Sequence, residues 1–392
     1  MRILQLHNRY QIVGGEEGVV QAERSLLQQQ GHFVECLEVS NDGIQGLGGK
    51  AIATANAIYS FSARQQVLKK IDQFQADLVH VHNFFPLLSP SVYDACRDRQ
   101  IPVIQTLHNY RLICPKAMLF RDNQVCELCV GQSFPLAGVK YGCYRGSKAQ
   151  TAVVSAMLSW HHLRGTWQNR VNTYIALTEF QKQKLVEGGL PSDRIQVKPN
   201  FTFVPDFPDL PRQSFILFVG RLAEEKGILQ LLEAYRLNPQ LPLLKIAGDG
   251  PLRPVLDQFI EQHHLHHRVQ LLGRQPKETI FELMQAAICL VFPSIWYEGF
   301  PLTIVEAFAC GLPVIVPSLG SMAEIVENGQ TGLHFQAQNS QDLADKITWM
   351  SQHRAEVSSM SEKAQHRYHQ SYTPQANYDR LMAIYQSSFT SK

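Results

Sequence analysis

The sequence predicts an α/β protein with two doubly wound domains, each a parallel sheet with helices on both faces. Short apolar runs alternate with longer amphipathic ones along the chain, which is typical of βαβ units. A proline-rich stretch without periodicity, Lys198–Arg212, interrupts this alternation near the middle. The 392 residues exceed what one ordinary core needs, so two domains of about 200 residues each are expected.

The N-terminal domain is expected over residues 1–200. Its predicted elements in chain order are strand Arg2–Leu6, helix Gly18–Gln29, strand Phe33–Leu37, helix Ala63–Phe74, the strands in DLVHVHN and IPVIQTLHN, strand Tyr174–Leu177 and helix Glu179–Gly188. The strands are short runs of apolar residues, and the helices have apolar residues at helical spacing. The segment 111–146 has little such periodicity and contains cysteines, so it is predicted to be an irregular insert.

After the linker 201–212, the second domain is expected over 213–373. Its predicted elements are the strand in FILFVGRL, helix Gly227–Arg236, the strand in LLKIAGDG, helix Pro251–His264, the strands in RVQLLG, ICLVFPS and PVIVP, and helix Asp342–His353. A last helix in 374–392 is expected to pack back on the N-terminal domain. Two such domains joined by a hinge are expected to face each other across a cleft.

The composition is that of a water-soluble globular protein, with 45% hydrophobic and 18% charged residues. The net charge is only +2, so it gives no argument for nucleic-acid binding. No run of about 20 apolar residues occurs, and the opening MRILQLHN resembles a strand rather than a signal peptide. A cytoplasmic location is expected, and contact with a membrane surface is compatible with it.

The stretch FPSIWYEGFPLTIVE (292–306) carries the most chemical information. It places Glu298 and Glu306 eight residues apart, across a turn that leads into a helix. Both carboxylates can accept hydrogen bonds from one polyhydroxylated ligand, while the N–H groups of the turn can hold an anion. The turn residues in question are Gly299, Phe300, Pro301 and Leu302. Hydroxyl ligands beside an anion site predict nucleotide-sugar binding, although Glu306 could also be a carboxylate on a helix surface.

Arg221 and Lys226 lie five residues apart in GRLAEEKG, a loop after a predicted strand. Two cations that converge on one point suit a diphosphate and can stabilise the charge on a departing group. Two solvated charges at a helix start are the alternative. The later GRQPKE loop could present backbone near Arg274 to a base edge, and GDGP (248–251) is most simply a structural turn.

These motifs, GRLAEEKG, GDGP and the E-x7-E pair in this order and spacing, resemble family 4 glycosyltransferases with the GT-B fold. The resemblance extends over nearly the whole chain. It implies transfer of a sugar from an activated donor with retention of configuration, and no metal is required for catalysis. It also implies that Arg221 and Lys226 clamp the diphosphate, that Glu306 binds ribose and that Glu298 binds the sugar. UDP-sugars are the commonest donors in this family, with GDP- and ADP-sugars as variants.

In the N-terminal half, Gly14 and Gly15 follow the first strand, where glycine lets backbone approach a phosphate or sugar closely. His80 and His82 lie at the end of one strand, and His108 follows another. His108 occupies the place where similar enzymes carry a His-Asp pair beside the reacting sugar. Because the next residue here is Asn109, we assign His108 to sugar positioning rather than proton transfer. The resemblance implies that the acceptor proton passes to the departing phosphate.

Four cysteines lie in the insert: Cys114, Cys126, Cys129 and Cys143. Four thiols that include a Cys-x2-Cys pair, in a segment with few apolar residues, fit a structural zinc site without an open position for catalysis. Free thiols are an equally weighted alternative, and a disulfide is less expected in a reducing compartment.

No Asp or Glu occurs from Leu128 to Thr178, whereas Lys140, Arg145, Lys148, Arg164 and Arg170 do. The apolar segment VVSAMLSWHHLRGTW lies inside this stretch. Such a segment could rest on an anionic membrane and face a lipid-linked acceptor, or it could be a core helix with a basic flank.

The sequence thus predicts a retaining hexosyltransferase, with UDP-glucose as the best guess for the donor. The acceptor would be a saccharide or a lipid-linked saccharide in bacterial envelope or exopolysaccharide synthesis. A nucleotide-sugar epimerase of the same fold and a non-catalytic scaffold subunit are the alternatives. No cofactor beyond structural zinc is expected.

Overall fold

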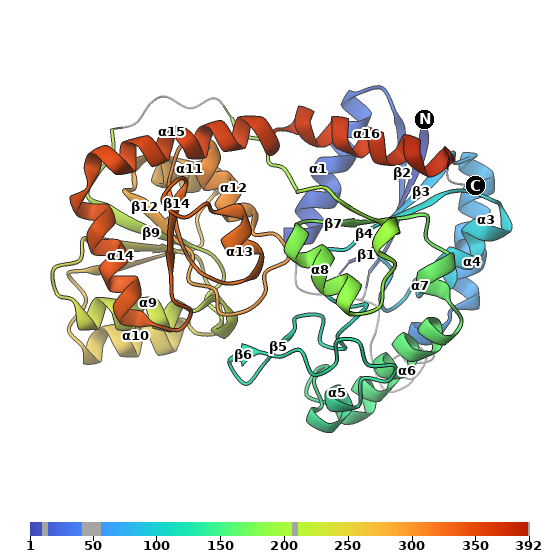
Figure 1. Ribbon diagram of the computed structural model, residues 1–392, viewed down its shortest axis with the longest axis horizontal. Helices are drawn as coiled ribbons and strands as arrows, with labels where there is room; N and C mark the ends of the chain where they lie inside the picture. Colours follow the sequence, from blue (N-terminus) through green and yellow to red (C-terminus); the bar gives the residue numbers. More distant parts are fainter. Residues whose placement is uncertain (10–14, 41–55, 206–210, 391–392) are drawn as a thin grey trace. The chain divides into compact units, whose positions relative to one another are not determined.

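The computed structural model describes residues 1–9, 15–40, 56–205 and 211–390 (Figure 1). The chain divides into two compact units. The first unit comprises Met1–Arg121, Cys126–Asn200 and Pro374–Lys392, and the second comprises Asp122–Val125 and Phe201–Thr373. The C-terminal segment therefore belongs to the first unit, although it follows the second in sequence. The predicted linker lies in part outside the described residues.

The first unit is built on a six-stranded, parallel sheet with the strand order β2-β1-β3-β4-β7-β8. The strands are β1 (Arg2–Arg9), β2 (Phe33–Ser40), β3 (Leu78–Asn83), β4 (Val103–Thr106), β7 (Thr173–Ala176) and β8 (Ile195–Val197). β3, β4 and β7 are buried along their whole length, and the buried residues of β3 include the polar His80, His82 and Asn83. Strands that follow β1 in the chain are added on one side as β2 and on the other side from β3 onward, so the strand order reverses between β1 and β3.

The helices of the first unit are α1 (Gly15–Gln29), α3 (Phe61–Phe74), α4 (Ser91–Asp98), α5 (Leu136–Tyr141), α6 (Lys148–Leu163), α7 (Thr166–Asn169), α8 (Glu179–Glu187) and α16 (Pro374–Thr390). α16 covers the same face of the sheet as α1. Its Leu381, Ile384 and Tyr385 are buried against Ile3 of β1 and Ile104 of β4. The last helix is thus part of the core of the first unit.

The insert is irregular apart from α5 and a hairpin of β5 (Phe120–Arg121) and β6 (Gln124–Val125). Its turns include several residues with positive φ, among them Asp122 and Asn123 at the hairpin. Asp and Asn tolerate this conformation better than most residues, so they suit the turn. The insert predicted over 111–146 thus contains the short helix α5 and this hairpin and is otherwise irregular.

The second unit has a parallel sheet with the order β11-β10-β9-β12-β13-β14. Its strands are β9 (Phe215–Val219), β10 (Leu243–Ala247), β11 (Val269–Gly273), β12 (Cys289–Val291), β13 (Val314–Pro317) and β14 (Gly332–Phe335). Counted in chain order, this is the arrangement 3-2-1-4-5-6 of doubly wound nucleotide-binding folds. The strand order reverses between β9 and β12.

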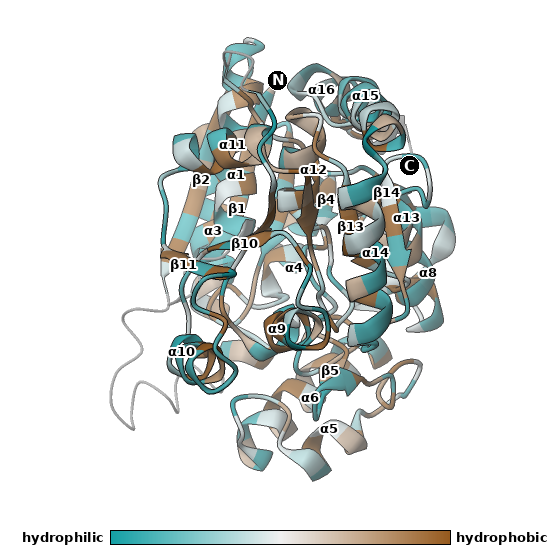
Figure 2. Cartoon of the chain, turned by 90° about the vertical axis from the view of Figure 1, so that its left-hand side faces the viewer, coloured by the Kyte–Doolittle hydropathy of each residue, from teal (hydrophilic) through white to brown (hydrophobic). Residues whose placement is uncertain are grey.

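The helices of the second unit are α9 (Ile228–Leu237), α10 (Arg253–Gln262), α11 (Lys277–Ala286), α12 (Leu302–Ala309), α13 (Gly320–Ile325), α14 (Ser340–Gln352) and α15 (Arg354–Ser371). Alternate residues of β9 enter two separate cores. Ile216 and Phe218 pack with α9, α10 and α14, whereas Phe215 and Leu217 pack with α11, α12 and α13. Figure 2 shows hydrophilic residues on α10 and α14 beside their apolar ones, as expected for helices covering one face of a sheet. Both doubly wound units are as predicted.

Candidate active site

The carboxyl ends of β9 and β12 lie side by side at the point where the strand order of the second unit reverses. Open parallel sheets bind ligands outside such strand ends. The loop after β9 contains GRLAEEKG, and the loop after β12 contains FPSIWYEGFP. The two sequence motifs therefore meet at the position that the fold favours for a ligand.

Two glycines set the path of the loop after β9. Gly227 has a φ of +66°, and a Cβ there would lie 2.0 Å from the carbonyl oxygen of Pro293. Gly248 in the GDGP turn has a φ of +152°, and a Cβ there would lie 1.9 Å from the carbonyl oxygen of Gly220. A side chain fits neither position, so both glycines are needed for the close approach of these loops. The GDGP turn also accepts a backbone hydrogen bond from Leu222 through Asp249, which gives it the structural role predicted for it.

Lys226 and Glu298 form an ion pair in which Nζ donates to Oε1 at 2.7 Å. The same carboxylate oxygen accepts hydrogen bonds from the Ser294 hydroxyl at 2.6 Å and the Trp296 indole N–H at 2.8 Å. Glu298 is buried and Lys226 is partly exposed. The pair joins two loops that are 72 residues apart in sequence. Among the described residues, no donor contacts the other carboxylate oxygen, so it can still accept from a ligand hydroxyl.

Arg221 lies on the same loop as Lys226 and forms an ion pair with Glu225. Its side chain is half exposed, whereas that of Glu225 is nearly buried. The guanidinium is thus held at the loop surface by one carboxylate and keeps donors for a second anion. The predicted contact of Arg221 with a diphosphate stays a prediction.

Glu306 lies on α12 with its Oε1 3.4 Å from Nζ of Lys277. Burial raises the pKa of Glu306, and the charge of Lys277 only partly opposes this. Glu306 is therefore neither on the helix surface nor part of the Lys226–Glu298 pair. Glu306 is thus a second carboxylate of the candidate site, and it is paired with Lys277.

The turn before α12 offers fewer N–H donors than its length suggests, because Pro301 has no N–H. No side chain caps α12, so the N–H groups at its start remain available to an anion. Phe300 also packs against the apolar core beside Tyr372, with ring centroids 5.9 Å apart. Pro301 cannot act as the predicted donor, and the donor roles of the N–H groups of Gly299, Phe300 and Leu302 stay predictions.

Arg274 follows β11 and is exposed, without an ion-pair partner in the part of the chain that the structure describes. In the first unit, Gly14 lies outside the described residues. Gly15 begins α1, and nothing lies within 4 Å of a Cβ placed there. Gly15 is thus in open space, as a ligand-facing glycine would need to be.

His108 follows β4 and is joined to β3 through His82. Its Nε2 lies 3.1 Å from Nδ1 of His82, and the two rings are stacked with centroids 5.4 Å apart. His82 is buried, whereas His108 is partly exposed. The neighbouring Asn109 accepts a hydrogen bond from the backbone of Arg111, which agrees with a structural role for the residue that replaces the expected carboxylate.

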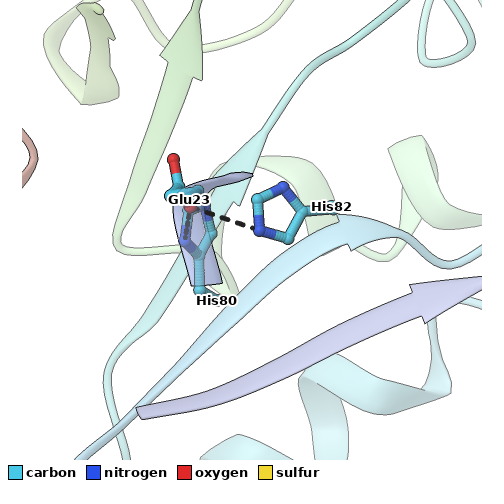
Figure 3. A group of neighbouring side chains, drawn as sticks. All are labelled: Glu23, His80 and His82. Atoms are coloured by element: carbon cyan, nitrogen blue, oxygen red, sulfur yellow. Dashed lines mark ion pairs between the residues drawn. The ribbon is translucent and has the colours of Figure 1, made fainter. Parts of the chain in front are cut away.

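His82 also belongs to a buried ionic cluster with Glu23 and His80 (Figure 3). Glu23 Oε1 is 3.1 Å from His80 Nδ1 and 3.3 Å from His82 Nε2, and Lys198 Nζ is 3.2 Å from Glu23 Oε2. Asn377 of α16 accepts from Lys198 at 3.3 Å. Glu23, His80 and His82 are also spaced closely enough to ligate a metal ion. Because the buried ammonium of Lys198 already compensates Glu23, we do not propose a metal there.

The pKa values follow from this arrangement. Burial alone would raise the pKa of Glu23, but the charges of Lys198 and His80 and the contacts with both histidines place it well below its usual value. Burial lowers the pKa of His82 to about 3, with a further contribution from His80. Burial and then His82 lower the pKa of His108 well below its usual value. Glu23 is therefore ionised, and His82 and His108 are neutral at neutral pH.

The sequence analysis missed Glu23, Lys198, Ser294 and Trp296. A signal for Glu23 was present, because this acidic residue lies on the buried stripe of α1 between Val19, Val20, Leu26 and Leu27. A carboxylate on the apolar stripe of a helix needs a buried partner. Nothing in the sequence identifies that partner as Lys198, which is 175 residues away.

The four cysteines of the insert form no disulfide. Burial raises the pKa of Cys129 to about 11, with contributions from Cys114, Cys143 and Cys126. Among the described residues, Glu23, His80 and His82 form the only group of three or more metal-binding side chains whose ligand atoms lie within 4.8 Å of one another. No three of the four sulfurs therefore lie within 4.8 Å of one another, whereas a tetrahedral site with Zn–S of about 2.3 Å needs separations of roughly 3.8 Å.

Zinc in the insert therefore stays a prediction. The thiol donor set suits zinc, and side-chain rotation could bring the sulfurs together around an ion. Protein purified without chelator should contain about one zinc per chain by elemental analysis. The Cys129→Ser variant should lose the metal, and the Cys36→Ser variant, outside the insert, should keep it. Metal-free protein with four titratable thiols in the insert would contradict the prediction.

Two family models match successive parts of the chain. Residues 13–202 match the model "Glycosyltransferase Family 4", and residues 205–367 match "Glycosyl transferases group 1". The first match lies in the domain that carries His108, and the second contains Arg221, Lys226, Glu298 and Glu306. The junction between them falls within the predicted linker.

Curated relatives match parts of the chain. An uncharacterized glycosyltransferase of Methanocaldococcus jannaschii is 36% identical over 139 residues, covering 35% of this chain and 34% of that protein. The putative teichuronic acid biosynthesis glycosyltransferase TuaC of Bacillus subtilis is 31% identical over 287 residues, covering 73% of this chain and 64% of that protein. The chain thus spans less than two thirds of the length of these relatives.

Among solved structures, HepE of Anabaena in complex with UDP has the same fold, with a TM-score of 0.69. Its sequence is 19% identical, and the match covers 99% of this chain and 100% of that one. Together with the strand order of both sheets, this match defines the GT-B fold. The chain belongs to the glycosyltransferases of the GT-B fold. In the described part of the chain, no helix has the length and apolar character needed to cross a membrane.

Proposed function

We propose that this protein is a retaining glycosyltransferase that binds a nucleotide-sugar in its second unit. The observation that carries the proposal is the Lys226–Glu298 pair, with Arg221 on the same loop, at the strand ends where the sheet order reverses. A cation that is partly exposed and held by a buried carboxylate is pre-oriented for an anionic ligand. The uncapped start of α12 supplies further donors for the same phosphate groups.

The chemistry assigned to these residues is electrostatic. Negative charge grows on the diphosphate as the bond to the sugar breaks, and Arg221 and Lys226 stabilise that charge. Glu298 orients Lys226 and offers its second oxygen to a sugar hydroxyl. Glu306 binds the ribose hydroxyls. His108 positions the sugar, and the proton of the acceptor hydroxyl passes to the departing phosphate.

UDP-glucose is the proposed donor. HepE shares the fold and binds UDP in its crystal structure, which supports testing uridine nucleotides first. A nucleotide-sugar fits a site with two separate carboxylates, Glu306 for the ribose hydroxyls and Glu298 for a hydroxyl of the hexose. The acceptor is proposed to be a saccharide or a lipid-linked saccharide in polysaccharide biosynthesis, in line with TuaC.

The proposal is tested by a donor-hydrolysis screen over nucleotide-sugars with mass-spectrometric detection. Slow release of UDP from UDP-glucose is expected, together with the largest thermal stabilisation by UDP among UDP, GDP and ADP. Retention is tested by the anomeric configuration of the transfer product. Equal thermal shifts for the three nucleotides would remove the donor assignment, and the absence of hydrolysis for every donor would contradict the function.

The outer side of α6 is the proposed membrane contact. One side of this helix is buried through residues such as Val154, Met157 and Leu158. The opposite side carries Ala152, Ala156, Trp160 and Leu163 at helical spacing, with Trp160 52% and Leu163 79% exposed. Lys148 and Arg164 flank this side, and no Asp or Glu of α6 interrupts it, although the Arg164 guanidinium also lies 3.4 Å from Asp94 of α4. An apolar strip with basic ends suits an anionic membrane surface.

The prediction is that the protein sediments with vesicles of phosphatidylcholine and phosphatidylglycerol. Binding should fall as salt is raised, because the basic flank is screened. The Trp160→Glu/Leu163→Glu variant should bind at least about tenfold more weakly, since each apolar side chain contributes about 1.5–3 kcal/mol when buried. Leu237→Glu, at an exposed apolar residue of α9, is the matched control and should bind as the wild type does. Equal binding of both variants would contradict the prediction.

A further inference from the structure

A line of contacts runs from the buried ion pair to the partly exposed His108. Glu23 Oε1 lies 3.3 Å from His82 Nε2, and His82 Nδ1 lies 3.1 Å from His108 Nε2. Glu23 comes from α1, His82 from β3, and His108 from the loop after β4. The three groups are therefore brought together by the fold rather than by sequence proximity.

Each contact in this line fixes the position of a proton. The charge of an ionised carboxylate attracts a hydrogen and repels a lone pair, so it favours a hydrogen on the His82 nitrogen that faces Glu23. His82 is neutral and has only one N–H, which leaves its Nδ1 as an acceptor. The 3.1 Å contact then requires His108 to donate through Nε2. His108 is also neutral, so its remaining nitrogen, Nδ1, has a free lone pair.

One neighbour favours the opposite arrangement. The Gln5 side-chain nitrogen lies 3.4 Å from His82 Nε2 and could donate to it if that nitrogen had no hydrogen. The contact with Glu23 is not an aligned hydrogen bond, since Glu23 Oε1 has no hydrogen-bond partner of good geometry among the described residues. It nevertheless places a full negative charge 3.3 Å from Nε2 of His82, whereas the longer Gln5 contact joins two neutral groups. The opposite arrangement would also place a nitrogen lone pair 3.3 Å from a carboxylate oxygen. Glu23 therefore decides the orientation of the proton.

Nδ1 of His108 has no hydrogen-bond partner among the residues that the structure describes. We propose that Glu23, held by Lys198, acts through His82 to keep His108 in the Nε2–H tautomer, so that its Nδ1 accepts a hydrogen bond from a sugar hydroxyl. Glu23 is thus a positioning residue, and the assignment of the ligand rests on the proposed function. The hydroxyl belongs either to the donor sugar or to the acceptor saccharide.

The tautomer itself is tested first, without any ligand. Protein with ¹⁵N-labelled histidine is examined by long-range ¹H–¹⁵N NMR, and the His108 signals are assigned from their loss in His108→Gln. The expected spectrum shows a protonated Nε2 and an unprotonated Nδ1 for His108. A protonated Nδ1 in the wild type would overturn the proposal, whatever the activity of the protein.

A double variant tests the role of Glu23. Glu23→Leu/Lys198→Met removes both charges of the buried pair at similar volume, which avoids an unpaired buried charge. Gln5 is then the remaining polar partner of His82 Nε2 and donates to it. The expected result is that the protons on both histidines change position, so that His82 carries its hydrogen on Nδ1 and His108 carries its hydrogen on Nδ1. An unchanged His108 tautomer in this variant would also overturn the proposal.

Tyr385→Phe is the matched control. The Tyr385 hydroxyl lies 2.8 Å from His80 Nδ1 in the same buried cluster, but it does not touch His82 or His108. This variant should lose some stability and keep the His108 tautomer. If Tyr385→Phe changes the tautomer as much as the double variant does, the effect is a general loss of packing and the proposal fails.

Hydrolysis of UDP-glucose without acceptor then identifies the source of the hydroxyl. A loss of about tenfold in the double variant, the size expected for one hydrogen bond, assigns the hydroxyl to the donor sugar. A reversed tautomer with unchanged hydrolysis assigns it to the acceptor. If the wild type hydrolyses no nucleotide-sugar, the proposed function fails, and the NMR result still decides whether Glu23 sets the tautomer.

Discussion

Replacing Lys226 by alanine should lower kcat/KM for donor hydrolysis by about 100-fold or more. Loss of one preorganised donor to a developing negative charge has an effect of this size. The ammonium group is held by Glu298 at 2.7 Å and lies over the rings of Phe292 and Trp296, with centroids 5.3 and 5.8 Å away. These contacts fix its position before a ligand arrives, so no other nearby lysine can replace it without reorganisation.

The measurement needs a control for charge and one for folding. Lys346→Ala removes another lysine of the second unit, which is ion-paired with Asp342 at 3.5 Å on the helix α14, and it should hydrolyse the donor as the wild type does. Lys226→Arg keeps the charge and should recover part of the activity. Lys346→Ala should melt close to the wild type, whereas Lys226→Ala should melt lower but remain folded at the assay temperature, because the buried Glu298 then keeps only its Ser294 and Trp296 donors. Hydrolysis by Lys226→Ala within threefold of the wild-type rate would remove the diphosphate clamp from the mechanism.

Both doubly wound sheets could be predicted from the sequence because their strands are buried on two faces. Such strands appear as short continuous apolar runs, as in the predicted FILFVGRL and PVIVP segments that contain β9 and β13. The strand order could not be predicted in the same way. Nothing local to β9 indicates that its neighbours are β10 and β12, because that pairing is decided by packing across the whole sheet.

The sequence could indicate candidate residues where they lie in a loop directly after a strand. Arg221 and Lys226 follow β9, and Glu298 follows β12, so their residue types and positions at strand ends indicated a ligand site. Their partners were not predictable. That Lys226 pairs with Glu298, and Arg221 with Glu225, depends on side-chain geometry at the meeting point of two loops. The cysteine spacing of the insert likewise suggests zinc. The distances between the sulfurs depend on side-chain rotamers, which the sequence does not give.

The buried cluster of the first unit illustrates the largest gap between sequence and structure. Lys198 appears in the sequence as a residue at the start of a linker, where lysine is ordinarily solvated. In the structure it is fully buried because α16, which is nearly 180 residues further on, covers it through Asn377. A long-range return of the chain therefore changes a surface charge into part of a core.

Breaking this buried pair should have the largest effect on stability. Glu23→Leu alone leaves the ammonium of Lys198 buried without its carboxylate, and it should destabilise the first unit by about 3–5 kcal/mol. The Glu23→Leu/Lys198→Met variant removes both charges and should recover most of this loss. The reason is that the cost comes from the unpaired charge rather than from the missing attraction. Scanning calorimetry should show a melting temperature lower by about 6–20 °C for the single variant.

The pH dependence gives the same prediction an independent check. The pKa of Glu23 is lowered by folding, so its contribution to stability is complete above the unfolded pKa of about 4.3 and is lost as the pH falls below it. The difference in stability between the wild type and Glu23→Leu that comes from the charge of Glu23 should therefore be complete at pH 6 to 8. It should shrink in strong acid. Asp72→Leu, which removes the exposed pair of Asp72 with Arg99 in the same unit, should change the melting temperature little. If Glu23→Leu is as stable as this control, the Glu23–Lys198 pair does not stabilise the first unit.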